Sequence, residues 1–69
     1  MNTETITQAV WQYPDGTFYM WKGEHGRNIK HKTPSLADAN KFDPDPDYRV
    51  APADEGKWVT VEVTFKKID

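Results

Sequence analysis

The tripeptide Pro14-Asp15-Gly16 lies between two aromatic runs and constrains the fold more than any other feature of the sequence. Proline presets φ at the first central position of a turn, aspartate suits the second, and glycine accepts the left-handed conformation that follows. The flanking runs, residues 5–13 and 17–23, are rich in β-branched and aromatic residues, which favour strands. The sequence therefore predicts a β-hairpin over residues 5–23, with a type I turn and a glycine bulge.

This predicted hairpin has one strongly aromatic face. If the turn pairs Tyr13 with Thr17, the register of the whole hairpin follows. Two residues that pair across the strands have side chains on the same face, and every second pair lies on that face. Trp11 then lies opposite Tyr19, and Ala9 lies opposite Trp21. Four rings share one face, namely Trp11, Tyr13, Tyr19 and Trp21. The other face carries Ile6, Val10, Phe18 and Met20.

Two interpretations of the aromatic face remain open. In the first it is the core, because large rings each bury about 150–250 Å² and cross-strand aromatic pairs stabilise hairpins. In the second it is an exposed platform for a partner protein, for nucleic-acid bases or for a second copy of the chain. The second interpretation requires the apolar face of the last strand to continue the face that carries Ile6 and Val10.

Residues 58–66 predict a further strand, because apolar and polar residues alternate there with a period of two. The side chains expected to point inward are Val59, Val61, Val63 and Phe65. Residues 34–41 predict a short helix, with Thr33 or Ser35 as its cap and Pro34 in its first turn. Two prolines, at positions 44 and 46, prevent this helix from continuing.

Charge is distributed unevenly along the chain. Residues 24–33 predict a basic loop with a possible short strand at 28–31, and the basic side chains in and beside it are Lys22, Arg27, Lys30 and Lys32. Residues 43–47 predict an extended acidic loop, which contains Asp43, Asp45 and Asp47. A brief strand is expected at residues 48–50 and a turn at 51–57.

Together these elements predict one small α+β domain spanning residues 1–69. Its antiparallel sheet has three to four strands, built from the hairpin 5–23 and the strand 58–66, and one short helix lies near 34–41. The chain has no cysteine, so no disulfide supports the fold. Without a signal peptide or an apolar span, a cytoplasmic location is expected.

Nothing in the sequence predicts catalysis, a cofactor or a bound metal. The three aspartates resemble the first positions of a calcium loop, but Tyr48 stands where such a loop needs glycine, so a solvated acidic loop is favoured. His25 and His31 are six residues apart and lack accompanying cysteines. The single serine, Ser35, has a capping role available. We therefore do not expect an enzyme.

The stretch "YPDGTFY…WKGEHGR" resembles the hairpins of MORN repeats over about a quarter of the chain. Those repeats act as arrays, and only one copy is present, so we attribute the resemblance to shared hairpin chemistry.

By elimination, the sequence predicts a non-catalytic module that binds a macromolecule. A protein-binding adaptor or inhibitor is favoured, of the small acidic type that phages and mobile elements use, by compositional analogy. The predicted contacts are the four rings of the aromatic face and the three loop aspartates. The first alternative is a single-stranded nucleic-acid-binding protein that uses the aromatic face with Lys22, Arg27, Lys30 and Lys32. The second is a structural subunit of a homo-oligomer, for example a homodimer closed by its aromatic face.

Overall fold

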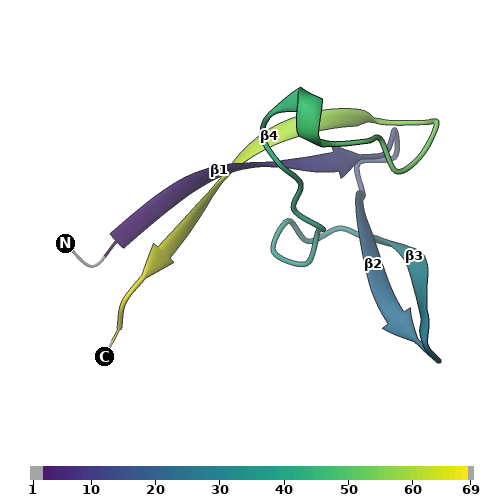
Figure 1. Ribbon diagram of the computed structural model, residues 1–69, viewed down its shortest axis with the longest axis horizontal. Coiled ribbons are helices and arrows are strands. Elements are labelled where there is room, and N and C mark those ends of the chain that lie inside the picture. Colours follow the sequence, from purple (N-terminus) through teal and green to yellow (C-terminus); the bar gives the residue numbers. More distant parts are fainter. Residues whose placement is uncertain (1–2, 69) are drawn as a thin grey trace.

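The computed structural model describes residues 3–68 and contains one antiparallel sheet of four strands. The strand order is β3-β2-β1-β4 (Figure 1). The elements are β1 (Thr3–Gln12), β2 (Phe18–Glu24), β3 (Arg27–Thr33), the 3-10 turn η1 (Pro46–Tyr48) and β4 (Lys57–Lys66). The antiparallel sheet, both hairpin strands and the C-terminal strand are thus confirmed. The only helix in the described residues is the three-residue 3-10 helix η1, so the fold is mostly β and the predicted α+β class is wrong.

The sheet consists of two long ribbons joined at one corner. β1 pairs with β4 along its whole length, from Thr3 opposite Lys66 to Gln12 opposite Lys57. β2 pairs with β3 in the same way. Within residues 3–68, β1 and β2 share the single register pair Gln12 and Phe18. Figure 1 shows the two ribbons diverging from this corner.

The predicted turn forms at this corner. The Gly16 N–H donates to the Tyr13 carbonyl at 3.0 Å, and the Tyr13 N–H donates to the Thr17 carbonyl at 2.8 Å. Gly16 has a φ of +89°, in the region where glycine carries no Cβ penalty. The Asp15 carboxylate accepts from the Thr17 N–H at 2.9 Å and from its hydroxyl at 2.6 Å. The turn and the register at its base are therefore as the sequence predicts.

Beyond that base, the predicted hairpin pairing is wrong, because a distant segment enters between β1 and β2. Ala9 and Phe42 exchange two backbone hydrogen bonds, of 3.1 and 2.8 Å. The Asn40 N–H donates to the Tyr19 carbonyl at 3.0 Å. Residues 40–42 therefore satisfy backbone groups that the predicted hairpin would have satisfied with its own partner strand, and Trp21 no longer lies opposite Ala9.

The same segment explains why the predicted helix near 34–41 is absent. Only one helical turn forms, closed by the Ala39 N–H donating to the Ser35 carbonyl at 3.1 Å. Thr33 supplies the predicted cap, since its hydroxyl accepts from the Ser35 N–H at 3.1 Å. The chain must then extend so that residues 40–42 can bond to the strands. The Lys41 ammonium donates to two carbonyls of the turn, those of Leu36 and Ala39, at 2.6 and 2.7 Å.

Two further local expectations are corrected. Residues 24–33 are not a basic loop: they form the tip and the second strand of a hairpin, and this strand, β3, contains the short strand expected at 28–31. The tip is tight, with φ values of +51° at His25 and +77° at Gly26. Positive φ at both central residues is what a two-residue type I′ hairpin turn requires. Residues 48–50 are not a strand: η1 ends at Tyr48, and the chain continues extended from Arg49.

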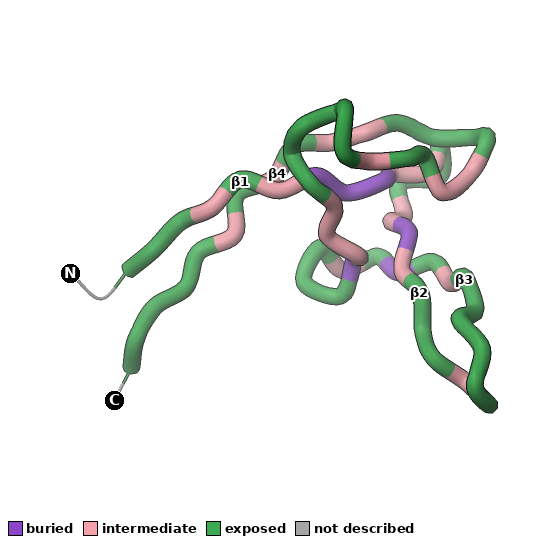
Figure 2. Tube along the Cα trace, viewed as in Figure 1, coloured by how far each residue is buried: buried purple, intermediate pink, exposed green. Residues whose placement is uncertain are grey.

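Four aromatic rings, each in contact with the next, form the core where the ribbons meet. Tyr19 packs against Phe42 with ring centroids 5.9 Å apart, and Phe42 packs against Trp58 at 5.0 Å. Trp58 in turn meets Trp11 edge-on at 5.0 Å. Trp11 and Tyr19 are only 6% and 8% exposed, so the core interpretation holds for these two rings. Figure 2 shows the buried residues gathered in this region.

The half of the β1–β4 ribbon that lies away from the corner is much less buried than the half beside the corner. Val61 and Val63 are half-buried, and Phe65 is 56% exposed. Phe65 lies on the same face of β4 as these valines, as the alternation predicts, but the expectation that it is buried is wrong. The ribbon extends past the loop segments that cover its other half (Figures 1 and 2).

Candidate functional site

The β2–β3 hairpin, which we call the arm (Phe18–Thr33), is largely exposed. Its strands pair from Phe18 opposite Thr33 to Glu24 opposite Arg27, and the turn His25-Gly26 forms its tip. Figure 1 shows the arm projecting away from the corner where the ribbons join. From Trp21 to the tip, nearly every residue is exposed. The arm therefore presents both of its faces to solvent over much of its length.

Charge distinguishes the arm from the rest of the protein. The arm contains four basic residues and one acidic residue, a formal charge of +3. The remaining residues include five basic and ten acidic side chains, a formal charge of −5. A projecting positive element on a negative body attracts and orients acidic partners.

Trp21 is the largest exposed ring on the arm. Its side chain is 47% exposed, and it lies opposite Lys30 in the β2–β3 register. Tyr19, the preceding residue on the same face of β2, is buried in the core. Trp21 is therefore the first residue of this face that lies outside the core. Tryptophan is enriched among the residues that carry most of the energy of protein interfaces.

Two of the arm's four basic side chains have partners within the chain. The Lys30 ammonium donates to the Pro52 carbonyl at 2.7 Å. Lys32 lies 3.6 Å from the Asp15 carboxylate and 4.5 Å from the centre of the Tyr13 ring. These contacts hold the base of the arm to the turn and to the loop before β4. Lys22 and Arg27, nearer the tip, are exposed.

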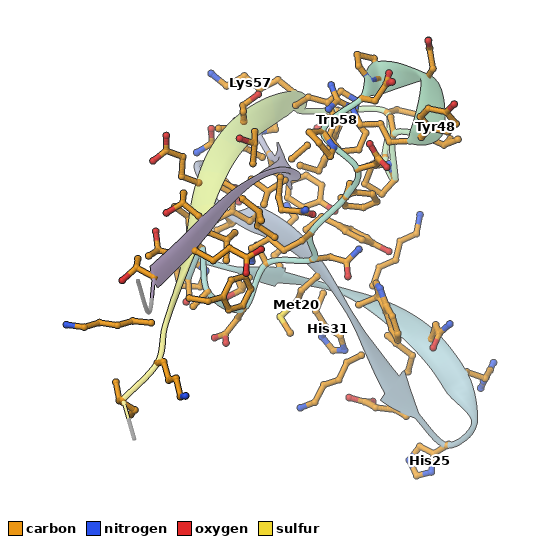
Figure 3. All side chains as sticks on the ribbon, turned by 60° about the vertical axis from the view of Figure 1, so that its left-hand side comes forward. Met20, His25, His31, Tyr48, Lys57 and Trp58 are labelled. Atoms are coloured by element: carbon orange, nitrogen blue, oxygen red, sulfur yellow. The ribbon has the colours of Figure 1, made fainter. Side chains whose placement is uncertain are left out.

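The opposite face of the arm is mixed in character. Met20 lies opposite His31, as Figure 3 shows, and Lys22 lies opposite Ile29, which is 37% exposed. The His31 Nε2 is 3.5 Å from the Glu24 carboxylate. This face therefore combines two exposed or half-buried apolar side chains with ionisable groups.

The structure separates the four rings that the sequence placed on one face. Trp11 and Tyr19 are core residues, and Trp21 is exposed. Tyr13 is half-buried beneath Lys32, and burial, followed by the charges of Tyr19 and Asp15, raises the pKa of its hydroxyl. Only Trp21 and part of Tyr13 are therefore available for contact with another molecule.

The acidic loop is exposed but well ordered by local hydrogen bonds. The Asp43 carboxylate accepts the Asp45 N–H, and the Asp45 carboxylate accepts the Asp47 N–H, each at 2.9 Å. Arg49 donates to the carbonyls of Asp43 and Pro44 at 3.3 and 3.0 Å, and its guanidinium lies 4.5 Å from the centre of the Trp58 ring. The loop thus folds back over the core as a separate acidic surface.

His25 and His31 lie on the arm, at its tip and near its base, and are not brought together (Figure 3). Across residues 3–68 there is no cluster of three or more His, Cys, Asp or Glu side chains arranged to hold a metal ion. No helix in the same range is long and apolar enough to cross a membrane. Sequence analysis identified the basic residues but missed that they form a hairpin. The pair His25-Gly26 was the available sign, because glycine accepts the positive φ of a tight turn.

Comparisons of the chain with protein-family models, with curated proteins and with solved structures found no match. The fold and the surface define a small four-stranded β protein with a projecting basic ribbon and an exposed tryptophan.

Proposed function

We propose that this protein is a non-catalytic adaptor or inhibitor that binds an acidic protein surface through its β2–β3 arm. The single observation that carries the proposal is Trp21, a half-exposed tryptophan on a ribbon with a formal charge of +3. Lys30 and Lys32 lie on the same face of the arm as Trp21, and the register places Lys22 and Arg27 on its other face. An aromatic anchor beside cations suits a pocket with an acidic rim on the partner. The ordered backbone of the arm limits the entropy that binding must overcome.

The test compares two exposed aromatic residues on different surfaces. Trp21→Ala removes the anchor, and Tyr48→Ala is the matched control, since Tyr48 is 75% exposed in η1, far along the chain from the arm. Wild-type protein immobilised on a resin captures a partner from lysate, and affinity for the purified partner is then measured by calorimetry. Trp21→Ala is expected to weaken binding at least about 30-fold, as truncation of an interface anchor does, and Tyr48→Ala about twofold or less. Equal affinities for both variants would refute the proposed contact.

The acidic loop is a second candidate contact, toward a basic partner surface. Of its three carboxylates, those of Asp43 and Asp45 accept backbone N–H groups, whereas no such bond is found for Asp47 within residues 3–68. Reversing the charge of Asp47 to lysine therefore changes the surface with the least effect on the loop. Unchanged affinity for the captured partner would exclude the loop from the interface.

A single-stranded nucleic-acid-binding protein remains the second proposal, favoured by the same basic ribbon. It requires cations that are free to meet phosphates, which makes Lys22 and Arg27 the main contributors. Fluorescence anisotropy with a labelled single-stranded oligonucleotide separates the two proposals. Phosphate contacts give affinity that falls steeply with salt, because each contact releases condensed counterions. Absence of binding at low salt would exclude this function.

A further inference from the structure

The two edges of the sheet differ in chemistry. β3 forms one edge and carries three exposed cations, Arg27, Lys30 and Lys32. Lysine-rich edges are a common protection against strand pairing with another molecule. β4 forms the other edge, and no strand within the described residues pairs with its outer side. The exposed half of β4 has no comparable excess of one charge.

The exposed half of β4 is complementary to itself. In an antiparallel pair of two β4 strands related by a twofold axis at Thr64, residues whose numbers lie equally far on either side of position 64 face each other. Glu62 then lies opposite Lys66 of the second copy, and the symmetry repeats this ion pair. Val63 lies opposite Phe65 of the second copy on the other face.

No other symmetric register of β4 pairs its acidic residue with a basic one. A twofold axis normal to the sheet keeps each side chain on its own face, and residues that pair across two strands share a face. The two residue numbers in each pair therefore differ by an even number. The charged residues of β4 are Lys57, Glu62 and Lys66, and only Lys66 is an even distance from Glu62. Opposite charges directly across a strand pair stabilise it, and like charges destabilise it.

We propose that the outer edge of β4 is a self-association surface, on which two copies of the chain pair about Thr64. The pairing joins two four-stranded sheets into one continuous sheet. It also accounts for the exposure of Phe65, because this ring gains Val63 of the second copy as a neighbour and continues the apolar stripe that includes Ile6. The arm lies at the opposite edge of the sheet, so this interface is independent of the proposed partner contact.

Single cysteines test the register directly, because the natural chain has none. Thr64→Cys places two thiols directly opposite each other, where the separation of Cα atoms falls in the range that a disulfide spans. Thr60→Cys is the matched control: it is also an exposed threonine on the same face of β4. In the proposed register its two copies are about 27 Å apart along the strands. Mild oxidation is expected to give a covalent dimer with Thr64→Cys and not with Thr60→Cys, and equal yields would overturn the register.

A charge exchange tests the same interface without covalent trapping. Glu62→Lys and Lys66→Glu each bring like charges together, and the double variant restores opposite charges with their positions exchanged. Sedimentation equilibrium is expected to show a wild-type dimer, dimerisation weakened about tenfold or more by each single variant, and recovery in the double variant. Circular dichroism confirms that the variants remain folded. A wild-type monomer at submillimolar concentration, or a dimer indifferent to both single variants, would overturn the proposal.

Discussion

Gly56→Ala perturbs the point at which the chain closes over the core. Gly56 precedes β4 and has a φ of +125°, a conformation that residues with a Cβ rarely adopt. A Cβ there would lie 2.5 Å from the Gln12 carbonyl oxygen and 2.6 Å from the Trp11 Nε1. The same indole N–H donates to the Glu55 carbonyl at 3.0 Å. The substitution therefore strains the backbone and displaces a buried ring together with its hydrogen bond.

The two costs can be estimated separately. A residue held in a sparsely populated backbone region costs about 1–3 kcal/mol. Forcing extra volume against a packed ring costs a further amount of about 1–3 kcal/mol. The sum is about 2–6 kcal/mol, against a total stability of about 3–10 kcal/mol for a chain of this length. At the midpoints of these ranges, Gly56→Ala is expected to remove about 4 of about 6.5 kcal/mol of the free energy of unfolding.

Urea unfolding followed by tryptophan fluorescence measures the change, with two other glycines as controls. Gly16→Ala has the backbone strain alone, because its φ is +89° and no atom lies within 4 Å of the added Cβ; the expected loss is about 1–2 kcal/mol. Gly23→Ala has neither cost and is expected to stabilise the strand by about 0.5 kcal/mol. A loss at Gly56 no larger than that at Gly16 would refute the proposed contact with Trp11.

Three further substitutions probe the turn and the joint between the ribbons. Lys41→Met removes the ammonium that donates to carbonyls of the single helical turn, and urea unfolding is expected to show a loss of about 1 kcal/mol. Phe42→Ala removes the ring between the ribbons and is expected to cost about 3 kcal/mol, whereas Tyr48→Ala, at an exposed site, is expected to change stability by less than about 0.5 kcal/mol. Hydrogen bonds from a neighbouring hydroxyl and N–H lower the pKa of Asp15, so its carboxylate stabilises the fold above about pH 4 and this contribution is lost as the pH falls through the folded-state pKa. Asp15→Asn is expected to flatten the decline of stability below about pH 4, and an unchanged decline would contradict this.

The proposed contacts occupy opposite edges of one sheet and can be tested independently. The β3 edge belongs to the arm, whose charge attracts acidic surfaces and discourages pairing with another strand. The β4 edge carries charges of both signs in a self-complementary order. If both proposals hold, a dimer presents two arms, and binding to a repeated partner gains from multivalency.

The turn at Pro14-Asp15-Gly16 and the strand at residues 58–66 were predictable because their determinants are local. Proline and glycine restrict φ at their own positions, and alternating apolar residues indicate a strand whatever surrounds it. The helix near 34–41 failed for the opposite reason. Its capping residue behaves as predicted, but two turns of helix are too weak alone to resist tertiary hydrogen bonds.

In the candidate site, too, the sequence predicted local features and the tertiary structure decided which side chains are buried. Sequence analysis identified the aromatic rings and the cations of the arm, because residue types can be read directly. It could not decide which rings are buried, since Phe42 reaches Ala9 from more than thirty positions away along the chain and replaces the pairing expected from the turn. By itself the sequence determined the turn, the strands beside it and the terminal strand. The tertiary structure decided that Trp11 and Tyr19 are core and Trp21 is surface, because burial depends on which distant segment satisfies the backbone groups of a strand.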